Sequence, residues 1–286
     1  MQSIRTDLAV EAHELRKKDR AENIDGVEVT TEDHGSVKVT RVIISNENGA
    51  KILGKAQGRY VTIETPNIRY SLDDYEKVDD KIAGELTKMA HIKSDMLTLV
   101  AGLGNRDITP DALGCAVISN LLVTNHLKEQ IHGTFNRDIS GVCAIAPGVL
   151  GTTGIETAQI IKGITDIVKP QLVVAVDALA AADIRRVSTT IQIADTGIQP
   201  GAGVGNNRKG LNEETLGIKV IAIGVPTVID AATISKVEIP KELAPLMVTT
   251  KDIDLVIERM AKTVANGINK ALQPEMSLNE IESYVR

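Results

Sequence analysis

Apolar residues along the chain follow two patterns, and the change between them falls near residue 97. Before that point, segments 36–45 and 59–65 alternate between apolar and polar residues and are rich in β-branched side chains, which is typical of strands. Residues 72–94 carry apolar side chains at helical spacing. Residues 1–25 are polar and charged, and we expect a helix or a mobile arm there. The first third of the chain therefore predicts a β-rich portion with helices beside it.

After residue 97, short continuous apolar runs alternate with amphipathic segments. A continuous run bounded by turn residues is typical of a strand buried on both faces. One helix is expected to begin at Thr109, which can cap it, with Pro110 in the first turn. The remaining elements are predicted as strands at 97–103, 142–149, 171–179, 189–195 and 219–230, and as helices at 154–168 and 251–272.

This alternation predicts an α/β fold with a mostly parallel central sheet flanked by helices on both faces, and with an N-terminal β-rich portion. We expect one catalytic domain over residues 1–286. The stretch 195–216 is rich in Gly, Asn and Pro and reads as a long loop between two strands. Long ordered loops in compact domains are usually functional or mobile.

Composition narrows the range of partners. Aromatic residues make up 2% of the chain and the net charge is −6, which argues against nucleic-acid binding by stacking or by phosphate neutralisation. The N-terminus has no apolar signal region and no apolar run reaches the length of a membrane span, so we expect a cytoplasmic protein without membrane contact. Cys115 and Cys143 lie in apolar surroundings and are expected to be reduced thiols.

The glycine turn after the strand at 97–103 resembles a dinucleotide-binding turn but departs from it. Gly102 and Gly104 fit the G-x-G-x-x-G pattern, whereas Asp107 stands at the third position, where it would face a pyrophosphate. We therefore expect no cofactor. What this turn offers instead is Asn105 and Asp111 at the carboxyl end of a strand, where open α/β folds place their sites.

A second carboxylate, Asp177, follows a run of five apolar residues. A carboxylate there is costly unless it is paired or functional. In a parallel sheet, Asp111 and Asp177 would emerge at the same edge and could meet in one crevice. The alternatives are structural: Asp111 as a first-turn helix residue favoured by the macrodipole, and Asp177 as a helix cap.

Other catalytic patterns are weak. Asp195-Thr196-Gly197 is the tripeptide of pepsin-like proteases, but it occurs once, and the α/β alternation does not fit their all-β fold. The histidines and cysteines lack the spacing of metal ligands, so we expect no metal site. Carboxylate chemistry remains the best-supported option.

Several motifs, in this order, resemble the germination proteases of spore-forming bacteria. They run from residue 4 to about residue 235 and include IRTDLAVEAHE, GLGNRDITPDALG, APGVLGTTGIET, VVAVDALAA, TTIQIADTGIQPGAGVGNNRK and ETLGIKVIAIGVPTVIDA. The resemblance implies an atypical aspartic endopeptidase that degrades small acid-soluble spore proteins early in germination. It also implies a phosphorylase/hydrolase-like fold similar to that of hydrogenase-maturation proteases, with Asp111 and Asp177 as the catalytic pair.

The resemblance further implies a zymogen that trims its own N-terminus, with a short propeptide at residues 1–7 and a cut between Asp7 and Leu8. Cleavage of substrates after glutamate implies a basic or backbone-lined pocket. The residues expected near the crevice are Asn105, Asp195, Arg185, Arg186 and Lys209, although the basic ones could equally be solvated surface charges.

Family members are homotetramers of the forespore and spore core, which we carry over as an expectation. Two other functions stay open at this point. A metal-dependent hydrolase resembling the hydrogenase-maturation proteases would lose activity with a chelator. A non-catalytic binding protein on the same fold would use its aspartates as caps, and their mutation would change stability alone.

Overall fold

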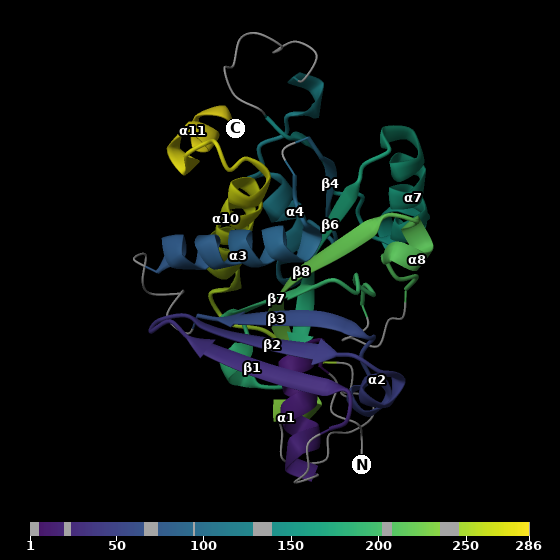
Figure 1. Ribbon diagram of the computed structural model, residues 1–286, viewed down its shortest axis with the longest axis vertical. Coiled ribbons are helices and arrows are strands. Elements are labelled where there is room, and N and C mark those ends of the chain that lie inside the picture. Colours follow the sequence, from purple (N-terminus) through teal and green to yellow (C-terminus); the bar gives the residue numbers. More distant parts are fainter. Residues whose placement is uncertain are drawn as a thin grey trace.

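The structure is a computed structural model of the chain (Figure 1). It describes residues 6–19, 24–65, 74–93, 95–127, 139–201, 208–234 and 246–285. No helix within these ranges is both long enough and apolar enough to cross a membrane.

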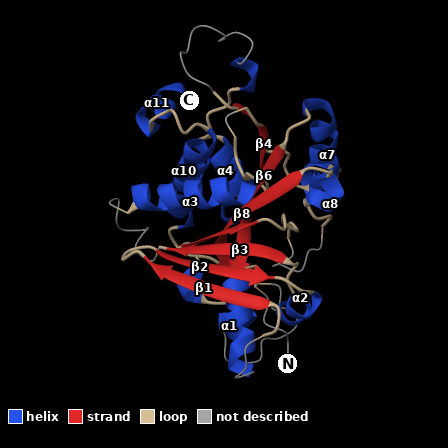
Figure 2. Ribbon diagram, viewed as in Figure 1, coloured by secondary structure: helices blue, strands red, loops and turns tan. Residues whose placement is uncertain are grey.

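Strands and helices alternate along most of the chain (Figure 2). The strands are β1 (Val27–Asp33), β2 (Lys38–Ile44), β3 (Gly58–Glu64), β4 (Leu97–Gly102), β5 (Gly141–Ile145), β6 (Leu172–Ala181), β7 (Thr190–Ala194), β8 (Lys219–Asp230) and β9 (Met247–Val248). The α-helices are α1 (Ala9–Asp19), α2 (Glu47–Leu53), α3 (Tyr75–Ala90), α4 (Leu113–Ile118), α6 (Leu150–Thr153), α7 (Thr157–Val168), α8 (Glu213–Leu216), α9 (Ala231–Ile234), α10 (Ile253–Leu272) and α11 (Leu278–Tyr284). Three short 3₁₀ turns are η1 (Thr109–Asp111), η2 (Asn125–Leu127) and η3 (Ile184–Arg186).

All described strands join one sheet in the order β1-β2-β3-β7-β8-β6-β4-β5, with β9 paired to β8. The block β8-β6-β4-β5 is parallel. From β7 outward through β3, β2 and β1 every pairing is antiparallel. The α/β fold, the parallel centre and the N-terminal β-rich portion are thus confirmed. The parallel strands form the central block of a mixed sheet, and β7, the strand expected at 189–195, runs antiparallel to both neighbours.

Three apolar clusters cover the two faces of the sheet. On one face, α3, α4 and α10 pack on alternate residues of the central strands, among them Val174 and Ile223. The opposite face is covered in two separate patches. Helices α7 and α8 pack over one patch with Val173 and Ala175, and α1 and the end of α2 pack over the other with Leu179. The pocket lies on this face and is lined by residues of both patches, among them Leu103 and Leu179.

Two local features differ from the sequence expectation for reasons of chain geometry. The segment after Thr109 opens as the 3₁₀ turn η1, and α4 begins only at Leu113. Strand β6 continues to Ala181, so that Asp177 stands inside the strand and does not cap a helix. The partner strand β8 is also long and pairs with β6 over its whole length, which keeps β6 extended beyond the residue where its apolar run stops.

Candidate active site

A cavity of about 860 Å³ opens on the sheet face between the two helical patches. Its floor is one row of residues across three neighbouring strands: Asp177 on β6 pairs with Gly224 on β8, which pairs in turn with Gln192 on β7. Residues in one row point to the same face of a sheet. Gly224 has no side chain, and the side chain of Leu179 packs against it between Asp177 and Gln192: a Cβ on Gly224 would lie 2.5 Å from Leu179 Cγ.

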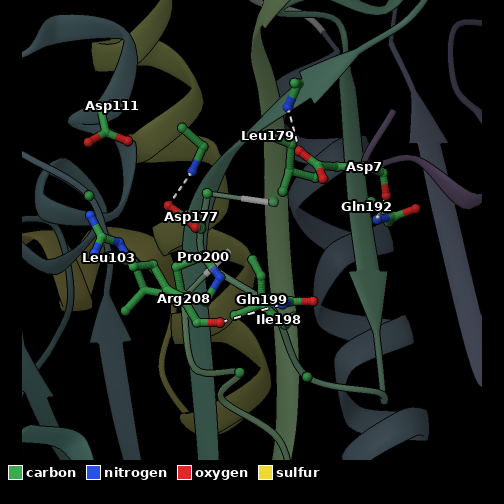
Figure 3. A pocket seen from close by; sticks show the side chains of 18 of the residues that line it. Asp7, Leu103, Asp111, Asp177, Leu179, Gln192, Ile198, Gln199, Pro200 and Arg208 are labelled. Atoms are coloured by element: carbon green, nitrogen blue, oxygen red, sulfur yellow. Dashed lines mark hydrogen bonds between the residues drawn. The ribbon is translucent and has the colours of Figure 1, made fainter. Parts of the chain in front are cut away.

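Asp177 is 5% exposed and lies one position beyond the last pairing of β4 with β6, between Gly102 and Val176. The side chain therefore borders the end of β4 and faces the cavity (Figure 3). Its Oδ1 accepts a hydrogen bond from the N–H of Ala178 at 2.9 Å. Burial raises the pKa of Asp177 well above its ordinary value, and the negative charge of Asp111 raises it further.

Asp111 reaches the same cavity from η1, in the turn that follows β4. Gly104 makes this approach possible: its φ is +96°, and a Cβ there would lie 1.9 Å from the carbonyl oxygen of Asp111. The N–H of Asn105 donates to Oδ2 of Asp111 at 2.8 Å. Burial raises the pKa of Asp111, and the hydrogen bond from Asn105 opposes that rise.

The structure therefore brings two carboxyl groups, one from a turn and one from a strand, to the lining of one pocket. Both have pKa values raised by burial, and the charge of one raises the pKa of the other. Two interacting carboxyl groups that cannot both ionise readily can share one proton, leaving one as a base and one as an acid. This arrangement is suited to general acid–base chemistry.

The chain's own N-terminal segment occupies the other side of the pocket. Asp7 lines the cavity, and Figure 3 places it across Asp177 from Asp111. Its main chain and side chain both pair with Ala180, through Asp7 N–H to the Ala180 carbonyl at 3.0 Å and Ala180 N–H to Asp7 Oδ2 at 2.8 Å. The next residue, Leu8, is fully buried and leads into α1.

The loop that follows β7 forms a further wall. Residues 196–201 line the cavity together with Arg208, Gly210 and Asn212, and a β-bridge between Ile198 and Leu211 holds the two limbs of the loop together. Asp195 itself pairs with Arg59 through a hydrogen bond of 2.7 Å between Nε and Oδ2. Lys209 is exposed, whereas its neighbour Arg208 lines the pocket.

The other two basic candidates lie away from the carboxylate pair. Arg185 has an 86% exposed side chain and forms an ion pair with Asp183. Arg186 is buried and binds Glu14 and Glu64, which join it to α1 and β3. Neither arginine contributes to the lining of the cavity, so the expected cluster of basic residues at the crevice is not formed by this pair.

Two residues of the pocket escaped the sequence analysis. Lys55 follows the left-handed Gly54 at the end of α2, and Gln192 sits in the middle of an apolar strand. A single lysine after a short helix carries no sequence signal. Gln192 offered a weak one, because a polar residue between Ile191 and Ile193 must find a partner when it is buried.

Within the described ranges, no three His, Cys, Asp or Glu side chains come together in a way that could hold a metal ion. The described residues of the pocket offer carboxyl groups, the ammonium group of Lys55, the guanidinium group of Arg208, side-chain amides and backbone hydrogen-bond donors.

Comparison with known proteins gives a consistent result. Residues 5–243 match the family model of germination proteases. A germination protease of Clostridium tetani is 44% identical over an alignment that covers 99% of both chains. Those of Caldanaerobacter subterraneus and of a Geobacillus species are 45% and 38% identical, and each alignment covers 99% of this chain and 98% or 97% of the relative.

Among solved structures, a NiFe hydrogenase maturation protease from Thermococcus kodakarensis is similar over 60% of this chain and 92% of its own. The identity is 21% and the TM-score is 0.32.

Proposed function

The chain belongs to the germination protease family, and from that premise we propose that it is an aspartic endopeptidase in which Asp111 and Asp177 are the catalytic pair. The observation that carries the proposal is that these two carboxyl groups line one pocket, with the pKa of Asp177 raised by burial and by the charge of Asp111. The chain's nature as a protease comes from its family; the assignment of residues is ours.

The two environments differ enough to divide the roles. Asp177 is more deeply buried, and its charged form is disfavoured both by desolvation and by its neighbour, so it holds the shared proton. The N–H of Asn105 stabilises the charged form of Asp111, which makes Asp111 the base. This is the division of labour that general acid–base hydrolysis requires.

In the proposed reaction, Asp111 accepts a proton from water as the water oxygen bonds to the peptide carbonyl carbon. Asp177 gives its proton to the carbonyl oxygen, which avoids an isolated negative charge in the pocket. When the intermediate breaks down, the proton on Asp111 passes to the amide nitrogen and the C–N bond breaks. A hydroxyl group of the intermediate returns one proton to Asp177, so that both side chains end as they began.

Self-processing between Asp7 and Leu8 is a further part of the proposal. Asp7 lines the cavity with Asp177 and is held there by Ala180, so Asp7 lies where a substrate would bind. Leu8 and Ala9 are fully buried, and α1 begins at Ala9. A cut after Asp7 would therefore release residues 1–7 while the new end of the chain stays packed in the fold.

The natural substrates in this proposal are the small acid-soluble spore proteins, and the place of action is the forespore and spore core. A homotetrameric assembly and a single catalytic domain over residues 1–286 belong to the same proposal.

The test is cleavage of a small acid-soluble spore protein, with the cuts mapped by mass spectrometry. Asp111→Asn and Asp177→Asn are each expected to slow both self-processing and substrate cleavage by at least about 100-fold, because each removes one partner of the proton transfer. Wild-type activity should rise with pH as Asp111 ionises and fall as Asp177 loses its proton, with both limbs above the ordinary aspartate value of 3.8.

Asp107→Asn is the matched control, because this exposed carboxylate belongs to the same turn as Asp111. Wild-type rates in either Asn variant of the pair, with an intact thermal melt, would contradict the assignment. Loss of activity with a chelator and recovery with a divalent metal would favour the metal-dependent hydrolase instead. A changed melting temperature without any cleavage by the wild-type chain would favour the binding protein.

A further inference from the structure

Three hydrogen-bond donors from distant parts of the chain converge on residue 7 (Figure 3 shows Gln192 beside Asp7). Lys55 Nζ donates to the carbonyl oxygens of Thr6 and Asp7 at 2.9 and 3.0 Å. Gln192 Nε2 donates to the same Asp7 carbonyl at 3.1 Å. The N–H of Ala180 donates to the Asp7 carboxylate at 2.8 Å. We call Lys55 Nζ, Gln192 Nε2 and the Ala180 N–H the donor cradle.

Each member of the donor cradle is fixed by the fold. Gln192 stands in the row of residues on the pocket floor, and its Oε1 accepts from the N–H of Ala9 at 2.8 Å, which directs its Nε2 toward Asp7. Ala180 belongs to β6 and pairs with β8. Lys55 follows Gly54, whose φ of +64° ends α2 and turns the chain toward the pocket.

The positive charge of Lys55 is balanced mainly by the carboxylate of Asp7, the residue that the donor cradle holds. Burial lowers the pKa of Lys55, and the negative charges of Asp7 and Glu11 raise it. Glu11 already accepts hydrogen bonds from the N–H groups of Ala182 and Asp183. Asp7 is thus the charge that Lys55 would lose on release of residues 1–7.

Release of that segment would leave all three donors of the cradle without the acceptors that they now contact. Partly buried donors and a partly buried ammonium favour a ligand that brings acceptors and negative charge. A peptide residue that presents a main-chain carbonyl and a carboxylate, as Asp7 does, satisfies the whole set. The donors lie in the cavity of the carboxyl pair, where a polypeptide substrate has to bind.

We propose that the donor cradle is the subsite that binds an acidic residue of the polypeptide substrate, and that Lys55 is its specificity-determining residue. The acidic residue lies on the amino side of the cleaved bond, in the place that Asp7 holds in the intact chain. Gln192 and Lys55 hold its carbonyl group, the N–H of Ala180 holds its carboxylate, and the positive charge of Lys55 attracts that carboxylate without a direct contact. This inference rests on the proposed function, since it takes the pocket of Asp111 and Asp177 as the active site.

Self-processing of the full chain gives the first test. Asp7→Asn keeps an oxygen that can accept from Ala180 but removes the charge that faces Lys55. In a chain that is otherwise wild type, Asp7→Asn should slow the appearance of the processed chain that begins at Leu8 by about 10- to 100-fold, which is the effect of losing one charge–charge interaction. In a Lys55→Met background the same change should have less than about a twofold effect, because the charge partner is gone.

Discrimination between substrates gives the second test. A protein that the wild-type chain cleaves after Glu is prepared with Gln at that one position, and kcat/KM is measured for both forms. The wild-type chain should prefer Glu by about 10- to 100-fold. Lys55→Met should reduce this ratio to near one, Lys55→Arg should restore part of it, and Lys51→Met, an exposed lysine one turn away, should leave it unchanged.

The two proposals fail in different ways. If the wild-type chain is active and Lys55→Met, folded by its thermal melt, still prefers Glu over Gln as the wild type does, the inference about Lys55 is overturned while the carboxyl pair stands. An equal effect of Asp7→Asn in both backgrounds overturns it as well. If Asp111→Asn and Asp177→Asn cleave at wild-type rates, the proposed function is overturned, and the inference about Lys55 loses its premise.

Discussion

At the scale of single residues, the site depends on a glycine as much as on its carboxylates. Asp111 can approach the end of β4 only because Gly104 adopts a left-handed backbone and has no Cβ. Any side chain at that position would collide with the main chain of Asp111, and both the turn and the orientation of the carboxylate would have to shift. Misplacement of a catalytic group by about 1 Å can cost about 100-fold in rate.

We therefore expect Gly104→Ala to lower kcat by at least about 100-fold while the chain remains folded. The control is Gly35→Ala in the turn between β1 and β2. Gly35 has a φ of +80°, and nothing lies within 4 Å of a Cβ built there. Gly35→Ala should lose about 1 kcal/mol of stability from backbone strain alone. Gly104→Ala should lose more because of the collision with Asp111, and only this variant should lose activity. Steady-state kinetics together with thermal melts separate the two effects, and equal kinetics in both variants would contradict the argument.

At the scale of elements, Arg186 joins α1 to the sheet. Its guanidinium binds Glu14 of α1 at 2.6 and 2.7 Å and Glu64 of β3 at 3.1 Å, and the residue is 8% exposed. These contacts raise its pKa above the usual arginine value. The arginine that the sequence suggested for substrate recognition thus anchors the helix that follows the segment in the pocket.

Arg186→Met is expected to lower the free energy of unfolding by about 3 kcal/mol, because it removes the positive charge 3.8 Å from the buried carboxylate of Glu11 and the partner of the partly buried Glu64. Arg185→Met is the matched control, since the neighbouring side chain is 86% exposed, and its loss should cost less than about 0.5 kcal/mol. Urea unfolding of the two variants measures the difference. Similar losses in both would show that the ion pairs of Arg186 add little to stability.

At the scale of the whole molecule, the packing of α3 against α10 links stability to pH. Asp79 of α3 is 2% exposed and accepts one hydrogen bond from Asn266 at 3.1 Å, and its other oxygen has no partner among the described residues. Burial raises the pKa of Asp79 from 3.8 to about 7. The folded state therefore binds this proton more tightly than the unfolded state does.

The contribution of Asp79 to stability is complete below about pH 4 and is lost as the pH rises toward 7. Asp79→Asn removes the titrating group and should make the chain more stable than wild type at pH 8, by about 2–4 kcal/mol, with little difference at pH 4.5. Chemical unfolding at the two pH values measures this. A constant difference between variant and wild type across this range would exclude the link to Asp79.

The amino-acid sequence by itself determined the kind and the order of most elements, because hydrophobic periodicity and turn residues act over a few positions. Strand β8 spans 219–230 as expected, and α10 begins within two residues of its predicted start. The sequence also singled out Asp177, since a carboxylate after an apolar run is costly wherever the chain folds, and Asp111, since it lies in the turn after a predicted buried strand. The prediction that Asp111 and Asp177 lie at the same edge of the sheet needed only these local patterns and the assumption that the strands are parallel.

Tertiary structure alone decided which distant residues meet. The antiparallel course of β7 puts Gln192 in one row with Asp177, and the pairing with β8 carries β6 on to Ala180. Lys55 reaches the pocket only because a left-handed glycine turns the chain after α2. Strand order and the direction of a loop depend on contacts between segments far apart in sequence. Hydrophobic periodicity carries no information about such contacts, so the donor cradle could be identified only from the folded structure.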